Sequence, residues 1–299
     1  MMEDKAFLSG YVSIIGSPNV GKSTLLNSLI GQKISIVSRK AQTTRNTIIG
    51  ILTRRHYQII FLDTPGIHTP KNKLQQYMVD SAYEANRDVD LTLFMLDARI
   101  GLGERDEDIM KRLDMERTLF IINKTDLINE DELRDIKDAL IEKGVRSKNI
   151  IPISALMGAG VAGLEDRIVT YLSEGPMYYP DDMITDKTER FIAGEIIREK
   201  ALLNLNQEIP HGIGVEIERM EEGEGLVEID ALIICEKDSH KGIIIGKKGA
   251  MLKKIASESR YDLERLFGTK VFLSVFVKVK KDWRNSPSML KELGYRKES

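Results

Sequence analysis

Residues 16–24, GSPNVGKST, combine two glycines, a lysine and two hydroxyl side chains in the pattern G-x-x-x-x-G-K-[ST]. Glycines allow backbone amides to turn inward around phosphate oxygens. Lys22 can then place its charge against the outer phosphates, and Ser23 can offer a hydroxyl to Mg²⁺. We therefore expect a nucleotide to contact Gly16, Ser17, Pro18, Asn19, Val20, Gly21, Lys22, Ser23 and Thr24.

Three further motifs follow in order: DTPG at 63–66, NKTD at 123–126 and SAL at 154–156. Asp63 can hold Mg²⁺ through a water, and the Gly66 amide can reach a γ-phosphate. Asp126 can accept hydrogen bonds from N1–H and the exocyclic amine of guanine, a donor pair that adenine lacks. A guanine-nucleotide site is thus expected to include Asp63, Thr64, Pro65, Gly66, Ile67, Asn123, Lys124, Asp126, Ser154, Ala155 and Leu156.

All four motifs lie where predicted strands end. Short β-branched runs alternate with amphipathic segments over residues 10–174, which predicts a doubly wound, mostly parallel sheet covered by helices. Such sheets bind ligands beyond the carboxyl ends of their strands. We expect strands at 11–16, 47–53, 57–63, 91–98, 117–123 and 149–154, and helices at 22–31, 71–86, 104–114, 130–143 and 161–174.

The pattern changes after a segment rich in Pro, Gly and Asp. We expect a GTPase domain over 1–175, a linker over 176–187 and a smaller α+β domain over 188–299. The second domain has the predicted order α-β-β-α-α-β. Its elements are expected at 188–204, 212–221, 225–235, two helices around a second glycine–lysine loop, and 270–281.

The phosphate-loop and strand-end motifs look like those of translation-factor-related GTPases. Residues 38–51, SRKAQTTRNTIIGI, strongly resemble switch I of the Era GTPases, and the likeness covers nearly the whole chain. It implies a slow GTPase in which Thr44 binds Mg²⁺ and senses the γ-phosphate. By this resemblance the catalytic residues are Lys22, Thr44 and Gly66, and the metal ligands are Ser23, Thr44, Asp63 and Asn19.

Ile67 stands where Ras-like GTPases carry the glutamine that orients the attacking water. An isoleucine cannot hydrogen-bond water, so it either packs or leaves this task to switch backbone, a monovalent cation or a partner. In related GTPases without the glutamine, an asparagine at the position of Asn19 resembles a K⁺ ligand. We therefore expect hydrolysis that depends on Mg²⁺ and is raised by K⁺.

The second loop, GKKG at 246–249, lies between two helices of the α-β-β-α-α-β unit. This order resembles a type II K-homology (KH) domain, whose G-x-x-G loop clamps single-stranded RNA. Ile243, Ile244 and Ile245 are expected partly to line the RNA groove and partly to pack. The resemblance implies an RNA site of Lys241, Ile244, Gly246, Lys247, Lys248, Gly249, Lys253, Lys278 and Lys280.

Charge supports an anionic partner for this end of the chain. Residues 241–299 hold 15 Lys and Arg against 6 Asp and Glu, whereas residues 1–240 hold 29 against 40. The only cysteine, Cys235, cannot form an internal disulfide, and no apolar run approaches the ~20 residues of a membrane helix. A cytoplasmic protein is therefore expected.

Three functions fit these features. The Era resemblance implies a GTPase that binds the 3′ end of small-subunit ribosomal RNA and assists assembly of the small subunit, with RNA stimulating hydrolysis. A membrane-associated regulatory GTPase is the alternative, since clustered Lys and Arg can bind the anionic inner face of a membrane. The third is an RNA-binding scaffold with a structural nucleotide. No feature indicates an obligate dimer, and a monomer is expected.

Overall fold

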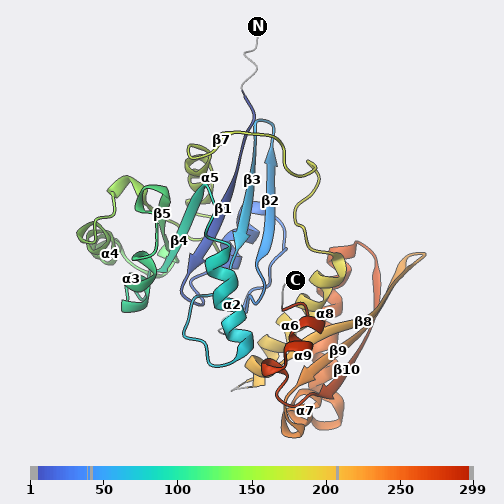
Figure 1. Ribbon diagram of the computed structural model, residues 1–299. Helices are drawn as coiled ribbons and strands as arrows, with labels where there is room; N and C mark the ends of the chain where they lie inside the picture. Colours follow the sequence, from blue (N-terminus) through green and yellow to red (C-terminus); the bar gives the residue numbers. More distant parts are fainter. Residues whose placement is uncertain (1–5, 39, 41–42, 207–208, 296–299) are drawn as a thin grey trace. The chain divides into compact units, whose positions relative to one another are not determined.

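The chain folds into two compact units (Figure 1). The computed structural model describes residues 6–38, 40, 43–206 and 209–295. The first unit takes its described residues from 1–35, 44–69 and 78–186, and the second from 36–43, 70–77 and 187–299. Two short segments from the N-terminal half of the chain therefore belong to the C-terminal unit.

The first unit is built on a sheet with the order β2-β3-β1-β4-β5-β6, in which β7 pairs with the start of β1. The pairs β1–β3, β1–β4, β4–β5 and β5–β6 are parallel, while β2–β3 and β1–β7 are antiparallel. The predicted mostly parallel sheet is confirmed. Its strands are β1 (Leu8–Gly16), β2 (Ile48–Arg54), β3 (Tyr57–Asp63), β4 (Leu91–Asp97), β5 (Thr118–Asn123), β6 (Ile150–Pro152) and β7 (Ser173–Glu174).

Helices cover both faces of this sheet. On one face Phe94 and Phe120 pack in a single cluster with Ala82 of α2, Ile109 of α3 and Ile136 of α4. On the other, α1 contacts α5, β2 and β3. The helices are α1 (Lys22–Ile30), α2 (Lys73–Glu84), α3 (Glu104–Met110), α4 (Glu130–Glu142) and α5 (Val161–Val169), with 3₁₀ turns at Met115–Arg117, Thr125–Leu127 and Ser147–Asn149.

Two predicted helices end earlier than expected. Helix α5 stops at Val169 rather than 174, because Ser173 and Glu174 form β7 against the start of β1. Helix α3 stops at Met110 rather than 114. Asp114 instead caps the following 3₁₀ turn, where its side chain accepts from the backbone N–H of Glu116 at 2.9 Å. Strand pairing with β1 therefore limits α5, whereas a local side-chain hydrogen bond competes with continuation of α3.

Hydrogen bonds with Gln58 and Ile51 hold the segment 176–186 against the rest of the first unit. The Oε1 of Gln58 accepts from the backbone N–H groups of Tyr178 and Tyr179, at 2.9 and 3.0 Å. Further along, the carbonyl of Ile184 accepts from the backbone N–H of Ile51 at 2.9 Å. Much of the predicted linker therefore lies along β2 and β3.

The second unit contains a three-stranded sheet, β10-β9-β8, and the order α6-β8-β9-α7-α8-β10 confirms the predicted KH topology. Helix α6 packs against α8 and β8. Among the described residues no helix is long and apolar enough to cross a membrane. The elements are α6 (Glu189–Asn204), β8 (Gly214–Gly223), β9 (Leu226–Cys235), α7 (Asp238–Ile245), α8 (Ala250–Phe267), β10 (Lys270–Val279) and α9 (Pro287–Glu292), with 3₁₀ turns at Ile209–Gly212, Lys247–Gly249 and Trp283–Asn285.

Alternate side chains of β10 face the core of the second unit. Val271 is buried, and Leu273, Val275, Val277 and Val279 pack on the same core as β9 and the helices. The C-terminal segment also contributes to packing. Trp283 is fully buried and its Nε1 donates to the Gly212 carbonyl at 3.0 Å, so this aromatic ring is part of the fold and cannot stack on a ligand.

Candidate functional site

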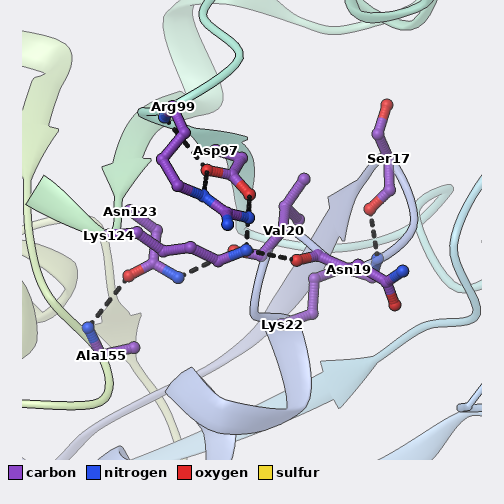
Figure 2. A network of polar contacts seen from close by, with 9 residues as sticks. All are labelled: Ser17, Asn19, Val20, Lys22, Asp97, Arg99, Asn123, Lys124 and Ala155. Carbon is purple, nitrogen blue, oxygen red and sulfur yellow. Dashed lines mark hydrogen bonds and ion pairs between the residues drawn. The ribbon is translucent and has the colours of Figure 1, made fainter. Parts of the chain in front are cut away.

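The phosphate loop connects β1 to α1. Gly16 ends the strand, and Gly21 (φ 107°) precedes the helix without any side-chain cap, so the first helical N–H groups point toward the loop. Lys22 is 6% exposed, and its Nζ donates to the Gly16 carbonyl at 3.1 Å. It also donates to the Ser17 carbonyl at 3.1 Å (Figure 2). Burial lowers the pKa of Lys22 to about 8, although the negative charge of Asp63 favours the protonated form.

Close approach explains two of the glycines. A Cβ on Gly21 would lie 2.2 Å from Nδ2 of Asn123, which leaves no room for a side chain. A Cβ on Gly66 would lie 2.9 Å from the Cα of Pro18. The DTPG motif thus packs directly against the phosphate loop, so the Gly66 amide is held beside the loop it was predicted to complete.

Ser23, Thr44 and Asp63 converge as a predicted Mg²⁺ site requires. The Ser23 hydroxyl lies 2.8 Å from Oγ1 of Thr44 and donates to Oδ2 of Asp63 at 2.7 Å. Asp63 is fully buried, and its Oδ1 has no hydrogen-bond partner among the described residues. Burial raises the pKa of Asp63 despite hydrogen bonds from Ser23 and Ser35. A buried carboxylate oxygen beside two hydroxyls fits a hard divalent cation.

A single carboxylate is consistent with a metal that also binds phosphate and water. In the part of the chain that the structure describes, no cluster of three or more His, Cys, Asp and Glu side chains could hold a metal ion. Mg²⁺ commonly keeps several waters and takes only one or two carboxylates together with substrate phosphates. The arrangement around Asp63 therefore suits a magnesium–nucleotide complex rather than an all-protein metal cage.

Asn123 connects the loops around the predicted base pocket. Its Nδ2 donates to the Val20 carbonyl at 2.7 Å, and its Oδ1 accepts from the backbone N–H of Ala155 at 2.9 Å (Figure 2). Asp126 is exposed, as is Leu156, whose exposed fraction is 79%. The carboxylate predicted to read guanine is therefore open to a ligand, while the amide beneath it is fixed in place.

Three residues of the predicted nucleotide site have side chains that the fold uses, so only their backbone groups can reach a nucleotide. Ile67 is 6% exposed and packs in the cluster of Ile15 and Phe94, so it neither orients water nor contacts a nucleotide through its side chain. The Thr64 hydroxyl donates to the Ile14 carbonyl at 2.8 Å. The side chain of Val20 is also buried. Thr64 and Val20 can contribute only backbone groups to the site.

The second glycine–lysine loop joins α7 to α8. Gly246, Lys248 and Gly249 all have positive φ angles, 72°, 52° and 78°. A Cβ on Gly246 would lie 2.8 Å from the Cβ of Met251, so this position requires glycine. Lys247 and Lys248 are exposed, and no ion pair between described residues involves either. The loop presents two unneutralised ammonium groups to solvent.

Other lysines of the predicted RNA site extend this positive surface. Lys253 and Lys278 are exposed, and Lys241 and Lys280 are half-buried. The prediction that the Ile244 side chain lines the RNA groove is wrong. It is fully buried in the core of the second unit, whereas the neighbouring Ile243 is 50% exposed. The helical period places consecutive residues on different faces, so only one of the two isoleucines can face a ligand.

Comparisons with known proteins identify the family of the chain. A family model described as 50S ribosome-binding GTPase matches residues 11–124, and a KH domain model matches residues 208–284. The chain is 53% identical to GTPase Era of Ruminiclostridium cellulolyticum over 97% of this chain and 98% of that protein. It is 52% identical to GTPase Era of Alkaliphilus oremlandii over 97% of this chain and 99% of that protein. The chain belongs to the Era GTPase family.

Solved Era structures have the same fold. A variant Era from Aquifex aeolicus, bound to GDP·AlF4⁻, is 41% identical with a TM-score of 0.93 over 97% of this chain and 99% of that one. An Era complex with MgGDPNP and nucleotides 1506–1542 of 16S ribosomal RNA matches with the same identity, TM-score and coverage. The predicted resemblance to Era is confirmed, and in the RNA-bound Era complex Mg²⁺ accompanies the nucleotide analogue.

In this Era family member, switch I and the two residues just before it, Ile36 and Val37, make contacts that their sequence does not reveal. Ile36 is buried in the core of the second unit, and the backbone N–H of Val37 donates to Glu199 on α6 at 2.8 Å. Arg198, also on α6, donates to the carbonyl of Thr43. The charged pair in the middle of α6 was the available signal, because Arg and Glu buried in a helix need polar partners from elsewhere in the chain.

Proposed function

We propose that this Era family GTPase binds the single-stranded 3′ region of small-subunit ribosomal RNA through its KH domain and assists assembly of the small subunit. The observation that carries the proposal is the exposed GKKG loop, with Lys247 and Lys248 unneutralised between two glycines of positive φ. A KH loop of this type clamps the backbone of a few nucleotides. The Era complex with a 16S ribosomal RNA fragment supports the assignment. Such a protein would act in the cytoplasm.

Hydrolysis at the first loop depends on positioning and charge neutralisation. Lys22 supplies a cation to the outer phosphates, and Ser23, Thr44 and Asp63 are the residues that would hold Mg²⁺. When bound, Mg²⁺ would supply charge neutralisation at the phosphate oxygens. Gly66 packs against Pro18 of the phosphate loop, from where its backbone N–H would donate to the γ-phosphate. No covalent intermediate with the protein is needed.

A group other than Ile67 must orient the attacking water, because the Ile67 side chain is buried in the core. We assign part of this task to K⁺ held by Asn19, whose left-handed backbone (φ 66°) lies within the phosphate loop. GTP hydrolysis should then be several-fold faster in K⁺ than in Na⁺, and Asn19→Ala should remove the difference. Equal rates in the two salts would exclude the cation.

RNA stimulation has a physical route through switch I. The Thr43 carbonyl accepts from Arg198 of α6, and the next residue, Thr44, reaches the Mg²⁺ site through its hydroxyl. Helix α6 packs on α8, which begins directly after the GKKG loop. A change in the loop on RNA binding can therefore alter the backbone that carries Thr44.

The test is GTP hydrolysis with and without a short RNA copied from the 3′ end of small-subunit ribosomal RNA. We expect stimulation with the wild-type chain and none with Gly246→Asp, because a side chain there meets Met251. Lys247→Ala/Lys248→Ala serves as a second variant, and an RNA of complementary sequence as a control. Equal stimulation of all three proteins would refute the proposal.

Anionic vesicles provide a further arm. If the basic surface served a membrane, vesicles rich in phosphatidylserine would bind the chain and compete with RNA. Binding that survives Gly246→Asp would identify the membrane as the partner of the surrounding lysines. We expect RNA to bind far more tightly than such vesicles, because the GKKG backbone geometry is specific for a nucleotide chain.

A further inference from the structure

Asp97 is a buried carboxylate that none of the nucleotide motifs includes. It is the last residue of β4 and is 4% exposed. Its Oδ1 accepts from the backbone N–H and the Nε of Arg99, each at 3.1 Å. Its Oδ2 accepts from Nη2 of Arg99 at 2.7 Å and from Nζ of Lys124 at 2.5 Å (Figure 2). Both oxygens are thus saturated by cations.

The same Lys124 ammonium holds the phosphate loop. Its Nζ donates to the Asn19 carbonyl at 2.7 Å (Figure 2). Asn19 and Lys124 have positive φ angles of 66° and 68°, a region that costs energy for a residue with a side chain. The bridge therefore joins two strained backbone positions, one in each loop.

The carboxylate stays charged where it lies. Burial alone would raise the pKa of Asp97, yet hydrogen bonds from Arg99 and Lys124 outweigh burial, so this pKa lies below its ordinary value. Arg99 grips the carboxylate through two guanidinium nitrogens and fixes its orientation. A lysine side chain is long and flexible, so a fixed anion at the strand end restricts where its ammonium can sit.

We propose that Asp97 is a positioning residue for guanine-nucleotide binding, which holds Lys124 on the Asn19 carbonyl so that the phosphate loop and the base loop keep one relative geometry. The proposal rests on the proposed function in one respect, that the ligand is a guanine nucleotide. Because the bridge spans the loops and touches no reacting atom, it acts on retention of GDP and GTP alike rather than on the hydrolytic step.

The experiment measures dissociation of fluorescent GDP and of a fluorescent non-hydrolysable GTP analogue by stopped flow. Asp97→Asn, which keeps the shape and removes the charge, should raise both dissociation rates by about tenfold, the usual effect of losing one charged hydrogen bond. The kcat at saturating GTP should change by less than about twofold. Asp108→Asn is the matched control, because Asp108 pairs with Lys111 on the exposed face of α3.

A double-mutant cycle separates positioning from a general structural role. If Asp97 acts through Lys124, then Lys124→Met combined with Asp97→Asn should release nucleotide no faster than Lys124→Met alone. If the two substitutions multiplied each other's effect on the dissociation rate, the proposal would be overturned. An Asp97→Asn protein with a lower Tm and unchanged dissociation rates would also overturn it. A wild-type chain that binds no guanine nucleotide would instead overturn the proposed function, so the two failures are distinguishable.

Discussion

The two glycine–lysine loops differ in how closely the protein encloses them. In the phosphate loop a Cβ on Gly21 would lie 2.2 Å from Nδ2 of Asn123, and Lys22 is 6% exposed. In the GKKG loop a Cβ on Gly249 meets nothing within 4 Å, and Lys247 is exposed. An enclosed loop can grip the phosphates of a small ligand from several sides. An open loop can lie along a polymer that continues in both directions.

Two adjacent isoleucines of α7, just before the open loop, test which side chain contacts RNA. Ile244→Ala should lower the free energy of unfolding by about 2–5 kcal/mol, because it removes a fully buried side chain from the core. Ile243→Ala, at a half-exposed position, should leave stability within about 0.5 kcal/mol and weaken RNA binding instead. Chemical denaturation and RNA titration measure the two effects. An equal loss of stability for both variants would remove Ile243 from the ligand surface.

Matched glycine substitutions probe enclosure directly. Gly21→Ala should weaken GDP binding by at least about 100-fold (about 2.7 kcal/mol), because the methyl group meets the fixed amide of Asn123. Gly249→Ala faces open space and bears only the strain of its φ angle, about 1 kcal/mol, so RNA affinity should fall by roughly fivefold. Isothermal titration gives both values. Comparable losses at the two positions would show that enclosure does not distinguish the loops.

Removing charge from the open loop should act through electrostatics. The Lys247→Ala/Lys248→Ala variant should bind RNA about tenfold more weakly at moderate salt, and the slope of log K against log salt should shrink by about 1.4. Lys254→Ala is the control, because Lys254 already pairs with Glu258 on α8 at 3.8 Å. Nucleotide affinity should not change. An unchanged salt slope would mean that neither lysine contacts a phosphate.

Nucleotide binding beside the enclosed Lys22 should be accompanied by proton uptake. Its pKa of about 8 lies below the ordinary value for lysine, so above this pH much of the Lys22 population is neutral in the folded protein. A bound phosphate favours the charged form, so binding of GDP at about pH 8.5 should take up a fraction of a proton, and at about pH 6.5 almost none. Calorimetry in buffers of different ionisation enthalpy measures this. Identical heats in all buffers at the higher pH would contradict the account.

The sequence predicted those parts of the site that depend on strand ends. The four nucleotide motifs each follow a buried strand, and parallel strands deliver their carboxyl ends to one edge, so Ser23 and Asp63 could be placed together in advance. The GKKG loop was equally readable, because Gly246 and Gly249 fit positions of positive φ.

Contacts between distant residues could not be read in the same way. Asp97 ends an apolar run, and nothing local shows that its carboxylate meets Lys124, which directly follows the next strand of the sheet. Residues 38–51 resemble switch I of a GTPase, yet nothing local shows that the preceding Ile36 and Val37 pack and hydrogen-bond in the KH unit. Short elements were also missed, since the two residues of β7 are too few to show a period.

One crossed binding measurement tests the central claim that each loop serves its own ligand. Fluorescent GDP and an RNA from the 3′ end of small-subunit ribosomal RNA are titrated into Gly21→Ala and into Gly246→Asp, with Lys247→Glu/Lys248→Glu as a second open-loop variant. The account predicts that Gly21→Ala loses GDP and keeps RNA, while both open-loop variants lose RNA and keep GDP. An open-loop variant that folds and still binds RNA like the wild type would contradict it.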